Sequence, residues 1–253
     1  MLKKVALVTF VLIFAFSLVS FAGTYDEIMK SGVIKVGNDA TYAPFEYRNF
    51  KNEIVGFDID LLKELVKEMG NLKLEIIDTA WDGIIPGLLS KKYDMIMSAM
   101  TITKERAKKV TFSDPYFETG QVIVVAKDRD DIKTVKDLEG KVIAVQLGTT
   151  GDFAASKIKG AKIKRFDTID KAYFEVMLGR ADAVVNDLAQ SAYGIKRFPL
   201  KIVGKPFTVE YYGIAMRKED KDLHKAVNAA LKKLKENGTY DKIYEKWFGK
   251  KAK

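Results

Sequence analysis

The feature that most constrains this chain is a regular alternation of short apolar runs with longer stretches of helical periodicity. The first run, Val33–Val36, is rich in β-branched residues and precedes an amphipathic helix that opens at Asp58 and ends at Gly70. The same alternation recurs almost to the end of the 253 residues. It predicts an α/β protein whose sheets are mostly parallel and flanked by helices.

The alternation falls into two series, one before about residue 118 and one from about 122 to 205. No low-complexity linker separates them, which favours two lobes with a cleft between them. The expected strands are Val33–Val36, Leu74–Ile77, Asp94–Met97, Gln121–Ala126, Lys141–Gln146, Ile163–Phe166, Ala183–Val185 and Tyr212–Met216. Besides the first helix, the expected helices are Trp81–Leu89, one after Gly151, Thr168–Leu178, one closed by Gly238 and a last one carrying Tyr244, Trp247 and Phe248.

The N-terminus has the three-part layout of a secretory signal peptide. Lys3 and Lys4 precede an uncharged run from Val5 to Ala22, and Ser20 and Ala22 supply small residues before a cut at Gly23. An uncleaved membrane anchor is the alternative, because eighteen apolar residues almost span a bilayer. We expect residues 1–22 to be cleaved and the mature protein to be periplasmic. It is not a lipoprotein, because no cysteine follows the cut.

Composition removes several kinds of chemistry. The chain has no cysteine, so thiolate zinc sites and disulfide frameworks are excluded. Its single histidine, His224, leaves almost nothing for histidine-rich metal sites or Ser-His-Asp catalysis. We expect no metal and no cofactor. The net charge is 43 − 34 = +9, but the lysines are spread among acids and the basic tail lacks aromatic residues for base stacking. A nucleic-acid partner is therefore not expected, and His224 is expected to face solvent.

The loops at the predicted strand ends carry the most specific sequence signal. Together with segments such as Gly56–Leu61 and Phe112–Tyr116, they resemble the periplasmic amino-acid-binding proteins of ABC importers, the family of the glutamine, histidine and lysine/arginine/ornithine binders. The resemblance covers essentially all of the mature chain. The loop segments that carry it are Asn38–Glu46, Trp81–Pro86, Ser98–Arg106, Gln146–Gly151 and Ala183–Asp187.

The resemblance implies a two-lobed periplasmic-binding-protein fold of type II, with the ligand cleft between the lobes. Lobe 1 would comprise residues 23–118 plus 209–253, and lobe 2 residues 119–208. Crossing segments near Glu118–Gln121 and Thr208–Tyr211 would act as hinges. A monomer is expected, whose partners are an L-amino acid and an inner-membrane ABC permease.

The resemblance also assigns the two charged groups of an amino acid to named residues. Arg106 would hold the α-carboxylate through its planar bidentate guanidinium, with help from Thr101 and Thr150. Asp187 and the backbone carbonyl of Ala99 would hold the α-ammonium. Alternatives from the residues alone are a surface ion pair for Arg106 and a helix N-cap for Asp187, and the N-cap can coexist with binding.

The ligand side chain would lie between two aromatic residues, Tyr42 and Trp81, although both could instead be core aromatics. Asp39 would face the end of that side chain, and Gln146 and Asn186 are candidates for specificity. Glu46 is expected on the surface.

A guanidinium can stack on aromatic rings and pair with Asp39, but Asp39 could equally accept from a glutamine amide. The glutamine binders of the family have a basic pair where this chain has Gln146 and Asn186, and this departure favours arginine, with glutamine or lysine possible. The competing interpretation is a cyclohexadienyl dehydratase-like enzyme on the same fold. That chemistry needs a proton donor, whereas a carboxylate facing an ammonium stays ionised, so no enzymatic activity is expected.

Overall fold

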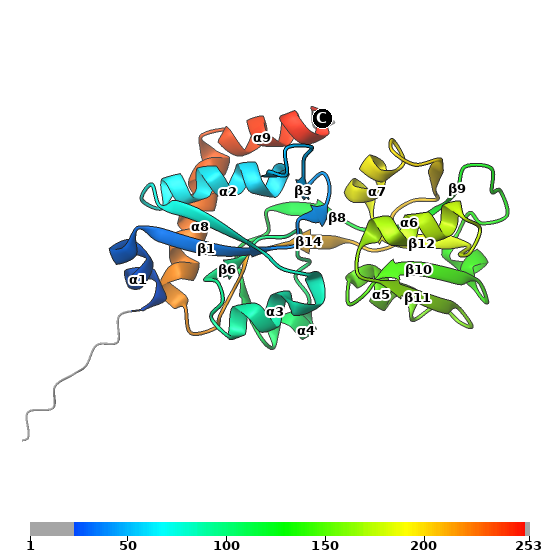
Figure 1. Ribbon diagram of the computed structural model, residues 1–253, viewed down its shortest axis with the longest axis horizontal. Coiled ribbons are helices and arrows are strands. Elements are labelled where there is room, and N and C mark those ends of the chain that lie inside the picture. Colours follow the sequence, from blue (N-terminus) through cyan, green and yellow to red (C-terminus); the bar gives the residue numbers. More distant parts are fainter. Residues whose placement is uncertain (1–22, 251–253) are drawn as a thin grey trace, which may run out of the picture.

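The computed structural model of the protein describes residues 23–250. The predicted signal peptide, residues 1–22, and the end of the basic tail lie outside the described residues. Within residues 23–250, the helices are all too short or too polar to span a bilayer. Figure 1 shows two lobes arranged along the long axis of the molecule, each with strands at its centre and helices around them.

Lobe 1 is built on a five-stranded sheet in the order β5-β1-β6-β15-β7. Strand β1 pairs in parallel with β5 and β6, whereas β15 runs antiparallel to β6 and β7, so four of the five strands share one direction. A small sheet, β2-β3-β4, lies beside it. These strands are β1 (Val33–Asn38), β2 (Thr41–Tyr42), β3 (Glu46–Arg48), β4 (Ile54–Val55), β5 (Lys73–Asp78), β6 (Met95–Ile96), β7 (Thr111–Phe112) and β15 (Ala215–Met216).

Helices cover both faces of the lobe 1 sheet. Helices α2, α8 and α9 pack together on one face, with α1 against α8, and α3 packs against β1 and β6 on the other. The α8 stripe of Leu223, Val227 and Leu231 is buried, as its helical spacing predicts. The lobe 1 helices are α1 (Thr24–Ser31), α2 (Phe57–Glu68), α3 (Trp81–Leu89), α4 (Lys104–Ala107), α8 (Lys221–Glu236) and α9 (Thr239–Phe248).

Lobe 2 repeats the arrangement with the order β11-β10-β12-β9-β13. Here β10 pairs in parallel with β11 and β12, and β9 is the antiparallel strand. The elements are β9 (Gln121–Ala126), the 3₁₀ helix η1 (Val135–Leu138), β10 (Val142–Gln146), α5 (Thr150–Ala155), β11 (Lys162–Phe166), α6 (Ile169–Met177), β12 (Ala183–Asp187), α7 (Leu188–Gly194) and β13 (Leu200–Val203).

The two lobes are joined by a two-stranded antiparallel ribbon of β8 (Phe117–Thr119) and β14 (Glu210–Tyr212). Figure 1 shows both strands running between the lobes. The ribbon continues into a close backbone approach at Gly120, where a Cβ atom would overlap the carbonyl oxygen of Thr208. Glycine is therefore required at this point of the crossing.

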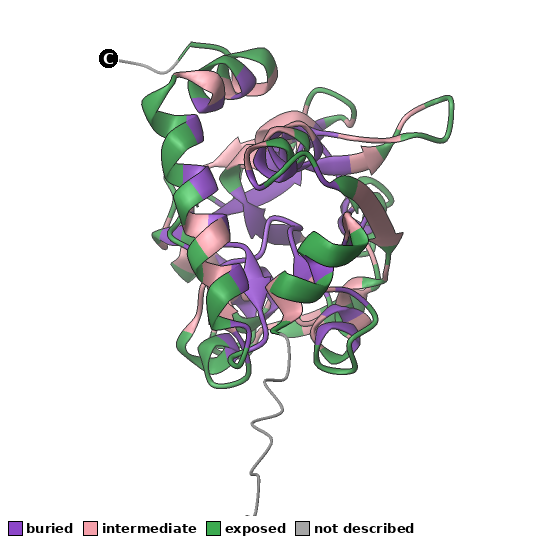
Figure 2. Cartoon of the chain, turned by 90° about the vertical axis from the view of Figure 1, so that its left-hand side faces the viewer, coloured by how far each residue is buried: buried purple, intermediate pink, exposed green. Residues whose placement is uncertain are grey.

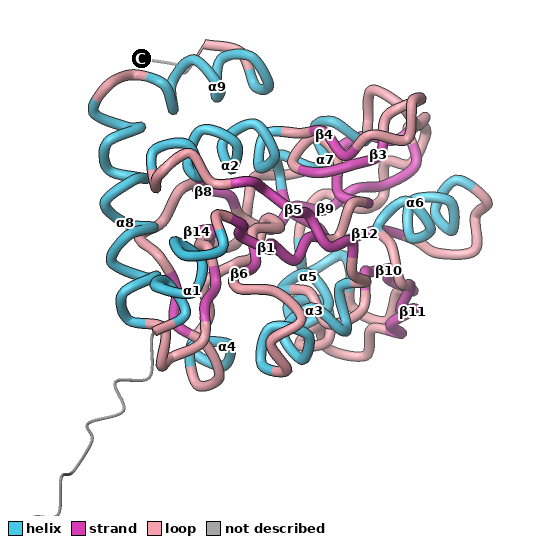
Figure 3. Tube along the Cα trace, turned by 60° about the vertical axis from the view of Figure 1, so that its left-hand side comes forward, coloured by secondary structure: helices cyan, strands magenta, loops and turns pink. Residues whose placement is uncertain are grey.

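Burial follows the layers. Figure 2 shows buried residues concentrated on the central strands and exposed residues on the outer sides of the helices. In β9 the side chains alternate between two apolar clusters: Val122 and Val124 pack on the α6 side, and Ile123 and Val125 on the opposite side. Figure 3 shows α8 and α9 as an outer border of lobe 1. The strands thus hold a rigid frame under the loops that face the cleft.

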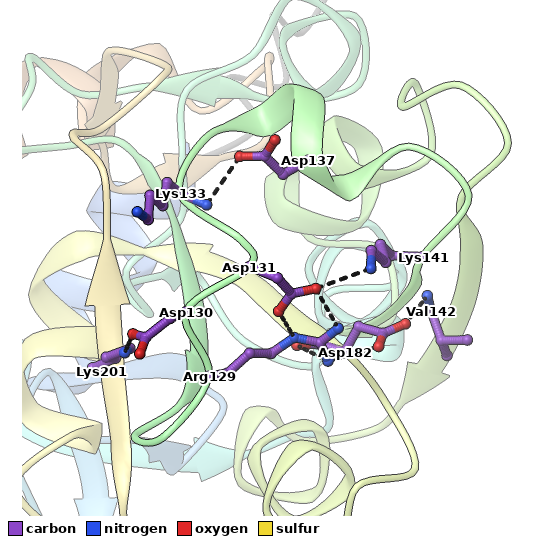
Figure 4. Close-up of polar contacts among 9 residues, drawn as sticks. All are labelled: Arg129, Asp130, Asp131, Lys133, Asp137, Lys141, Val142, Asp182 and Lys201. Carbon is purple, nitrogen blue, oxygen red and sulfur yellow. Dashed lines mark hydrogen bonds and ion pairs between the residues drawn. The ribbon is translucent and has the colours of Figure 1, made fainter.

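An ion-pair network braces the edge of lobe 2 that carries the start of β10. Arg129 pairs with Asp131 and Asp182 at 2.7 and 2.6 Å, and Lys141 pairs with Asp131 at 3.1 Å. Figure 4 shows these side chains together with the amide of Val142, which donates to Asp182. Burial acts to raise the pKa of Asp182, but the Val142 amide and Arg129 outweigh it and lower that pKa. The network ties β9, β10 and β12 together.

Most predicted elements are present with ends shifted by one or two residues. One prediction is wrong: Tyr212–Met216 is not a single strand. It breaks at Gly213 and Ile214, so that Glu210–Tyr212 belongs to the crossing ribbon and Ala215–Met216 to the lobe 1 sheet. Strand membership in two different sheets is set by tertiary pairing and not by the local apolar run.

Candidate functional site

A pocket lies between the lobes, at the carboxyl ends of β1, β6, β10 and β12. In α/β sheets this is where loops converge and ligands bind. The pocket brings together nine of the ten residues assigned from the sequence, and Asn186 is the exception. Its lining residues are Asp39, Tyr42, Glu46, Trp81, Ser98, Ala99, Thr101, Arg106, Gln146, Thr149, Thr150 and Asp187.

Arg106 is a buried cation without an anionic partner among the described residues. It lies in the short helix α4, whose N-cap residue Thr103 accepts a hydrogen bond from the Arg106 amide. Its guanidinium donates to the carbonyl oxygens of Thr101 (2.8 Å) and Gly148 (3.3 Å), and it stacks 5.0 Å from the Trp81 ring. Burial lowers the pKa of Arg106 to about 10, with Asp187 and Glu210 acting in the other direction. The group therefore stays charged at neutral pH.

Thr101 and Thr150 face each other across the cleft. Their hydroxyl oxygens lie 3.4 Å apart, and the Thr101 hydroxyl also donates to Glu210 (3.0 Å). Thr150 is the first residue of α5, and its hydroxyl accepts from Gln121 at 3.2 Å. Both hydroxyls therefore lie in the same pocket as Arg106, one on each lobe.

Asp187 is a buried carboxylate held only by neutral donors. It accepts from the hydroxyls of Tyr42 (2.7 Å) and Tyr212 (2.6 Å) and from the amide of Gln121 (2.5 Å). It occupies the N-cap position of α7, yet its side chain makes no capping hydrogen bond. Burial first, and then Glu210, raise the pKa of Asp187 to about 6. At neutral pH it remains an anion, with no cation bonded to it in residues 23–250.

The two aromatic residues differ in their surroundings. Tyr42 is buried in the cleft, and its hydroxyl also donates to Asn186 at 3.0 Å. Trp81, at the start of α3, is half-buried and has the Arg106 guanidinium against its ring. Asn186 lies behind Tyr42 and donates to Gln190 (2.7 Å), outside the pocket wall. Asn186 thus contacts Tyr42 without lining the pocket, and its role in specificity stays a prediction.

Asp39 and Gln146 meet across the two lobes. The Gln146 amide donates to Asp39 at 3.1 Å, and the Thr41 hydroxyl donates to the other carboxylate oxygen at 2.8 Å. Burial raises the pKa of Asp39 to about 6, against the two hydrogen bonds from Thr41 and Gln146. This carboxylate contributes a second negative charge to the pocket.

Two placements expected from the sequence are wrong. Glu46 is fully buried and lines the pocket, because β3 folds back beside β2 and turns this side chain inward. His224 is not fully solvent-facing: it is half-buried, and its ring nitrogen lies 2.9 Å from the carbonyl oxygen of Phe112. The sequence reasoning also missed Ser98 and Thr149 as lining residues, although both lie inside the loop segments it singled out.

Residues 34–250 match the family described as bacterial extracellular solute-binding proteins, family 3. The chain belongs to this family. A curated relative named "Probable histidine-binding protein", from Neisseria gonorrhoeae, is 40% identical over 232 residues, which cover 87% of this chain and 84% of the relative. Family members of this kind bind amino acids in the periplasm.

Solved structures of amino-acid-binding proteins share the fold of this chain. The holo form of ArgBP from T. maritima is 51% identical, with a TM-score of 0.80, covering 88% of this chain and 99% of that one. An ancestral amino acid-binding protein described as a precursor of cyclohexadienyl dehydratase is 50% identical, with a TM-score of 0.84 and coverages of 89% and 99%. The two-lobed fold expected from the sequence is therefore confirmed.

Proposed function

We propose that this protein captures a free polar or basic L-amino acid, with arginine favoured and glutamine or lysine as further ligands. Capture takes place in the periplasm, after cleavage of residues 1–22, and the loaded protein delivers its ligand to an inner-membrane ABC permease. The protein acts as a monomer and as a binding protein, without catalysis.

The observation that carries the proposal is a pair of buried, opposite charges without ionic partners among the described residues. The Arg106 guanidinium donates hydrogen bonds only to carbonyl oxygens, and the Asp187 carboxylate accepts only from hydroxyl and amide groups. Buried charges are costly unless they are paired. A zwitterionic ligand supplies both counter-charges at once: its carboxylate pairs with Arg106 and its ammonium with Asp187 and the Ala99 carbonyl.

The rest of the pocket favours a cationic side chain. Asp39 adds a carboxylate that Gln146 and Thr41 satisfy only with neutral hydrogen bonds, and Tyr42 and Trp81 offer aromatic surface. A guanidinium can use both the charge and the rings. The similarity to holo ArgBP supports arginine as the ligand. The relative named for histidine makes histidine a second ligand to test.

Hinge closure is the mechanism proposed for capture, with lobe boundaries at residues 118–121 and 208–211. Lobe 1 supplies Arg106 and Asp39, and lobe 2 supplies Asp187 and Gln146, so a ligand that touches all four stabilises the closed arrangement. The contacts from Tyr42 to Asp187 and from Gln146 to Asp39 already cross between the lobes. A micromolar ligand corresponds to roughly 8 kcal/mol of binding free energy.

The dehydratase-like alternative is weaker. It needs a carboxyl that donates a proton to a leaving hydroxyl. Three neutral hydrogen-bond donors hold Asp187, and an ammonium partner would favour its ionised form further. Incubation with prephenate or arogenate, followed by product analysis, separates this activity from binding.

The proposal is tested by thermal-shift screening against the twenty amino acids, followed by calorimetry on the hits. A ligand at 100 times its dissociation constant adds about 2.7 kcal/mol to the free energy of unfolding. We expect arginine to give the largest shift. A protein that binds glutamine or histidine and ignores arginine would contradict the ligand assignment, and one that binds no amino acid would contradict the function.

A further inference from the structure

Two buried carboxyl groups, Glu46 and Asp58, lie against each other in lobe 1. Glu46 is the first residue of β3 and Asp58 the second residue of α2, and both are 0% exposed. Each side chain lies close enough to the other to affect its pKa. One oxygen of each, Glu46 Oε2 and Asp58 Oδ1, is buried and has no hydrogen-bond partner among the described residues. Two adjacent buried carboxylates without donors are unfavourable, and one proton between them would satisfy both oxygens.

The other oxygens of the pair hold the pocket wall. The Ser98 hydroxyl donates to Glu46 Oε1 at 3.0 Å and accepts from the Asp39 amide at 2.9 Å. Asp58 Oδ2 accepts from the Ala99 amide at 2.8 Å and from the Tyr116 hydroxyl at 2.6 Å. Through these hydrogen bonds the pair contacts the residues that follow β1 and β6, two lobe 1 strands that lead into the pocket.

Ala99 has a backbone conformation that needs such support. Its φ is 43°, in the left-handed region that non-glycine residues adopt rarely. Strained backbone of this kind persists only where the surroundings fix it. The hydrogen bond from its amide to Asp58 fixes it here, and Ala99 lines the pocket.

The groups around the pair favour a proton on Glu46 and a negative charge on Asp58. Burial, then Asp58 and then Asp39, raise the pKa of Glu46 well above its usual range. Burial also raises the pKa of Asp58 to about 6, opposed by the donors Tyr116 and Ala99. Tyr116 stays neutral, since burial and the two carboxyls raise its pKa. The donors gather on Asp58, which makes it the anion and Glu46 the proton carrier.

We propose that Glu46 and Asp58 share a single proton at neutral pH and act as one positioning unit, which holds Ser98, Ala99 and Asp39 in the geometry that receives the ligand. Proton sharing concerns the unliganded protein and does not depend on what the protein binds. The effect on affinity rests on the proposed amino-acid-binding function.

Glu46→Gln is the informative variant, because its amide copies a protonated carboxyl. The amide group can donate to Asp58 while its oxygen accepts from Ser98. Glu46→Ala removes the acceptor of the Ser98 hydroxyl and the carboxyl group that lies beside Asp58. Glu219→Gln is the matched control, since Glu219 is exposed and does not line the pocket.

The proton is detected by infrared spectroscopy of the unliganded protein at neutral pH. We expect a carbonyl band of a buried protonated carboxyl in the parent and in Glu219→Gln, and its loss in Glu46→Gln. Equal bands in the parent and in Glu46→Gln would overturn proton sharing, whatever the protein binds.

Calorimetry with L-arginine tests the positioning role. At neutral pH we expect Glu46→Gln to bind within about threefold of the parent and Glu46→Ala at least about tenfold more weakly. As pH rises through the pKa of Glu46, the parent should lose affinity while Glu46→Gln does not. If Glu46→Gln is weakened as much as Glu46→Ala, or keeps the parent's alkaline loss, the positioning role is wrong. If the parent binds no amino acid, the proposed function fails, and the infrared result still decides the pair.

Discussion

Arg106 and Asp187 face the pocket with opposite charges, and each is bonded to neutral groups alone within the described residues. Every L-amino acid presents the same α-carboxylate to Arg106, so this contact should be common to all ligands. Arg106→Ala should weaken every accepted amino acid by about a hundredfold, since a charge-assisted bidentate contact contributes on the order of 3 kcal/mol. Arg48→Ala, at an exposed ion pair with Asp78, is the control. Calorimetric affinities of Arg106→Ala within about threefold of the parent would remove the assignment.

Asp39 is expected to favour ligands with a positively charged side chain. Asp39→Asn should weaken arginine more than glutamine, because a guanidinium loses a charge-assisted partner worth roughly 1.5–3 kcal/mol, whereas an amide loses an ordinary hydrogen bond. The ratio of arginine to glutamine affinity should fall by about tenfold. Asp128→Asn, at an exposed position in lobe 2, serves as the control. Equal losses for both ligands would show that Asp39 maintains the shape of the pocket instead.

At this scale the sequence predicts most lining residues, because the resemblance places them loop by loop. It does not predict Glu46, whose surface placement was the natural expectation for a carboxylate. Its burial places it beside Ser98 and Asp58, which are 52 and 12 positions away in the chain. A protonation state leaves no mark in the sequence.

Among the elements, the crossing segments between the lobes leave no room for a side chain at Gly120. A Cβ atom on Gly120 would meet the Thr208 carbonyl oxygen, which is backbone and cannot move alone. Gly120→Ala should therefore lower the free energy of unfolding by roughly 1–3 kcal/mol and weaken ligand binding, because the crossing backbone must shift to relieve the overlap. Gly83→Ala, in α3 with its nearest neighbour atom at 3.9 Å, should be neutral or stabilising. Unfolding in denaturant and calorimetry on both variants decide; identical behaviour would contradict the steric role of Gly120.

Long elements were predictable because their periodicity extends over several turns or residues, as in α8 and β9. The short strands β2, β3, β4, β7 and β8 were not predicted, since two or three residues carry no readable period. The division of Tyr212–Met216 between two sheets has the same origin. Pairing partners far away in the chain, Phe117 for Tyr212 and Ile96 for Ala215, decide which sheet each residue joins.

For the whole molecule, the two sheets share one strand order, with the strand next to one edge antiparallel in each. In both cases that strand directly follows a crossing segment: β9 follows β8, and β15 follows β14. The alternation in the sequence predicts two α/β lobes. It does not predict which strand of each sheet is antiparallel, because the chain enters lobe 2 and returns without a change in its local pattern. The arrangement places Asp39 and Arg106 of lobe 1 opposite Asp187 of lobe 2 in one pocket.

The titration of Asp187 should change stability and ligand affinity in opposite directions as pH rises. The pKa of Asp187 in the folded, unliganded protein is raised from 3.8 to about 6, mainly by burial. Its contribution to stability is therefore fully present below pH 3.8 and is lost as pH rises through about 6. A bound ammonium favours the carboxylate form instead, so affinity should be full above about pH 6 and should fall by up to about tenfold per pH unit below it.

Comparison with Asp187→Asn isolates this carboxylate from the other titrating groups. Without ligand, the stability of the parent relative to the variant should fall by on the order of 3 kcal/mol between about pH 4 and pH 7, since the shift is about two pH units. The stabilisation that arginine gives the parent should grow over the same range, whereas in Asp187→Asn it should be small at every pH because the ammonium has lost its charged partner. Unfolding curves at a series of pH values, with and without arginine, measure both effects. Parallel curves for the two proteins, with the same response to arginine, would mean that Asp187 neither titrates in this range nor receives the ligand's ammonium.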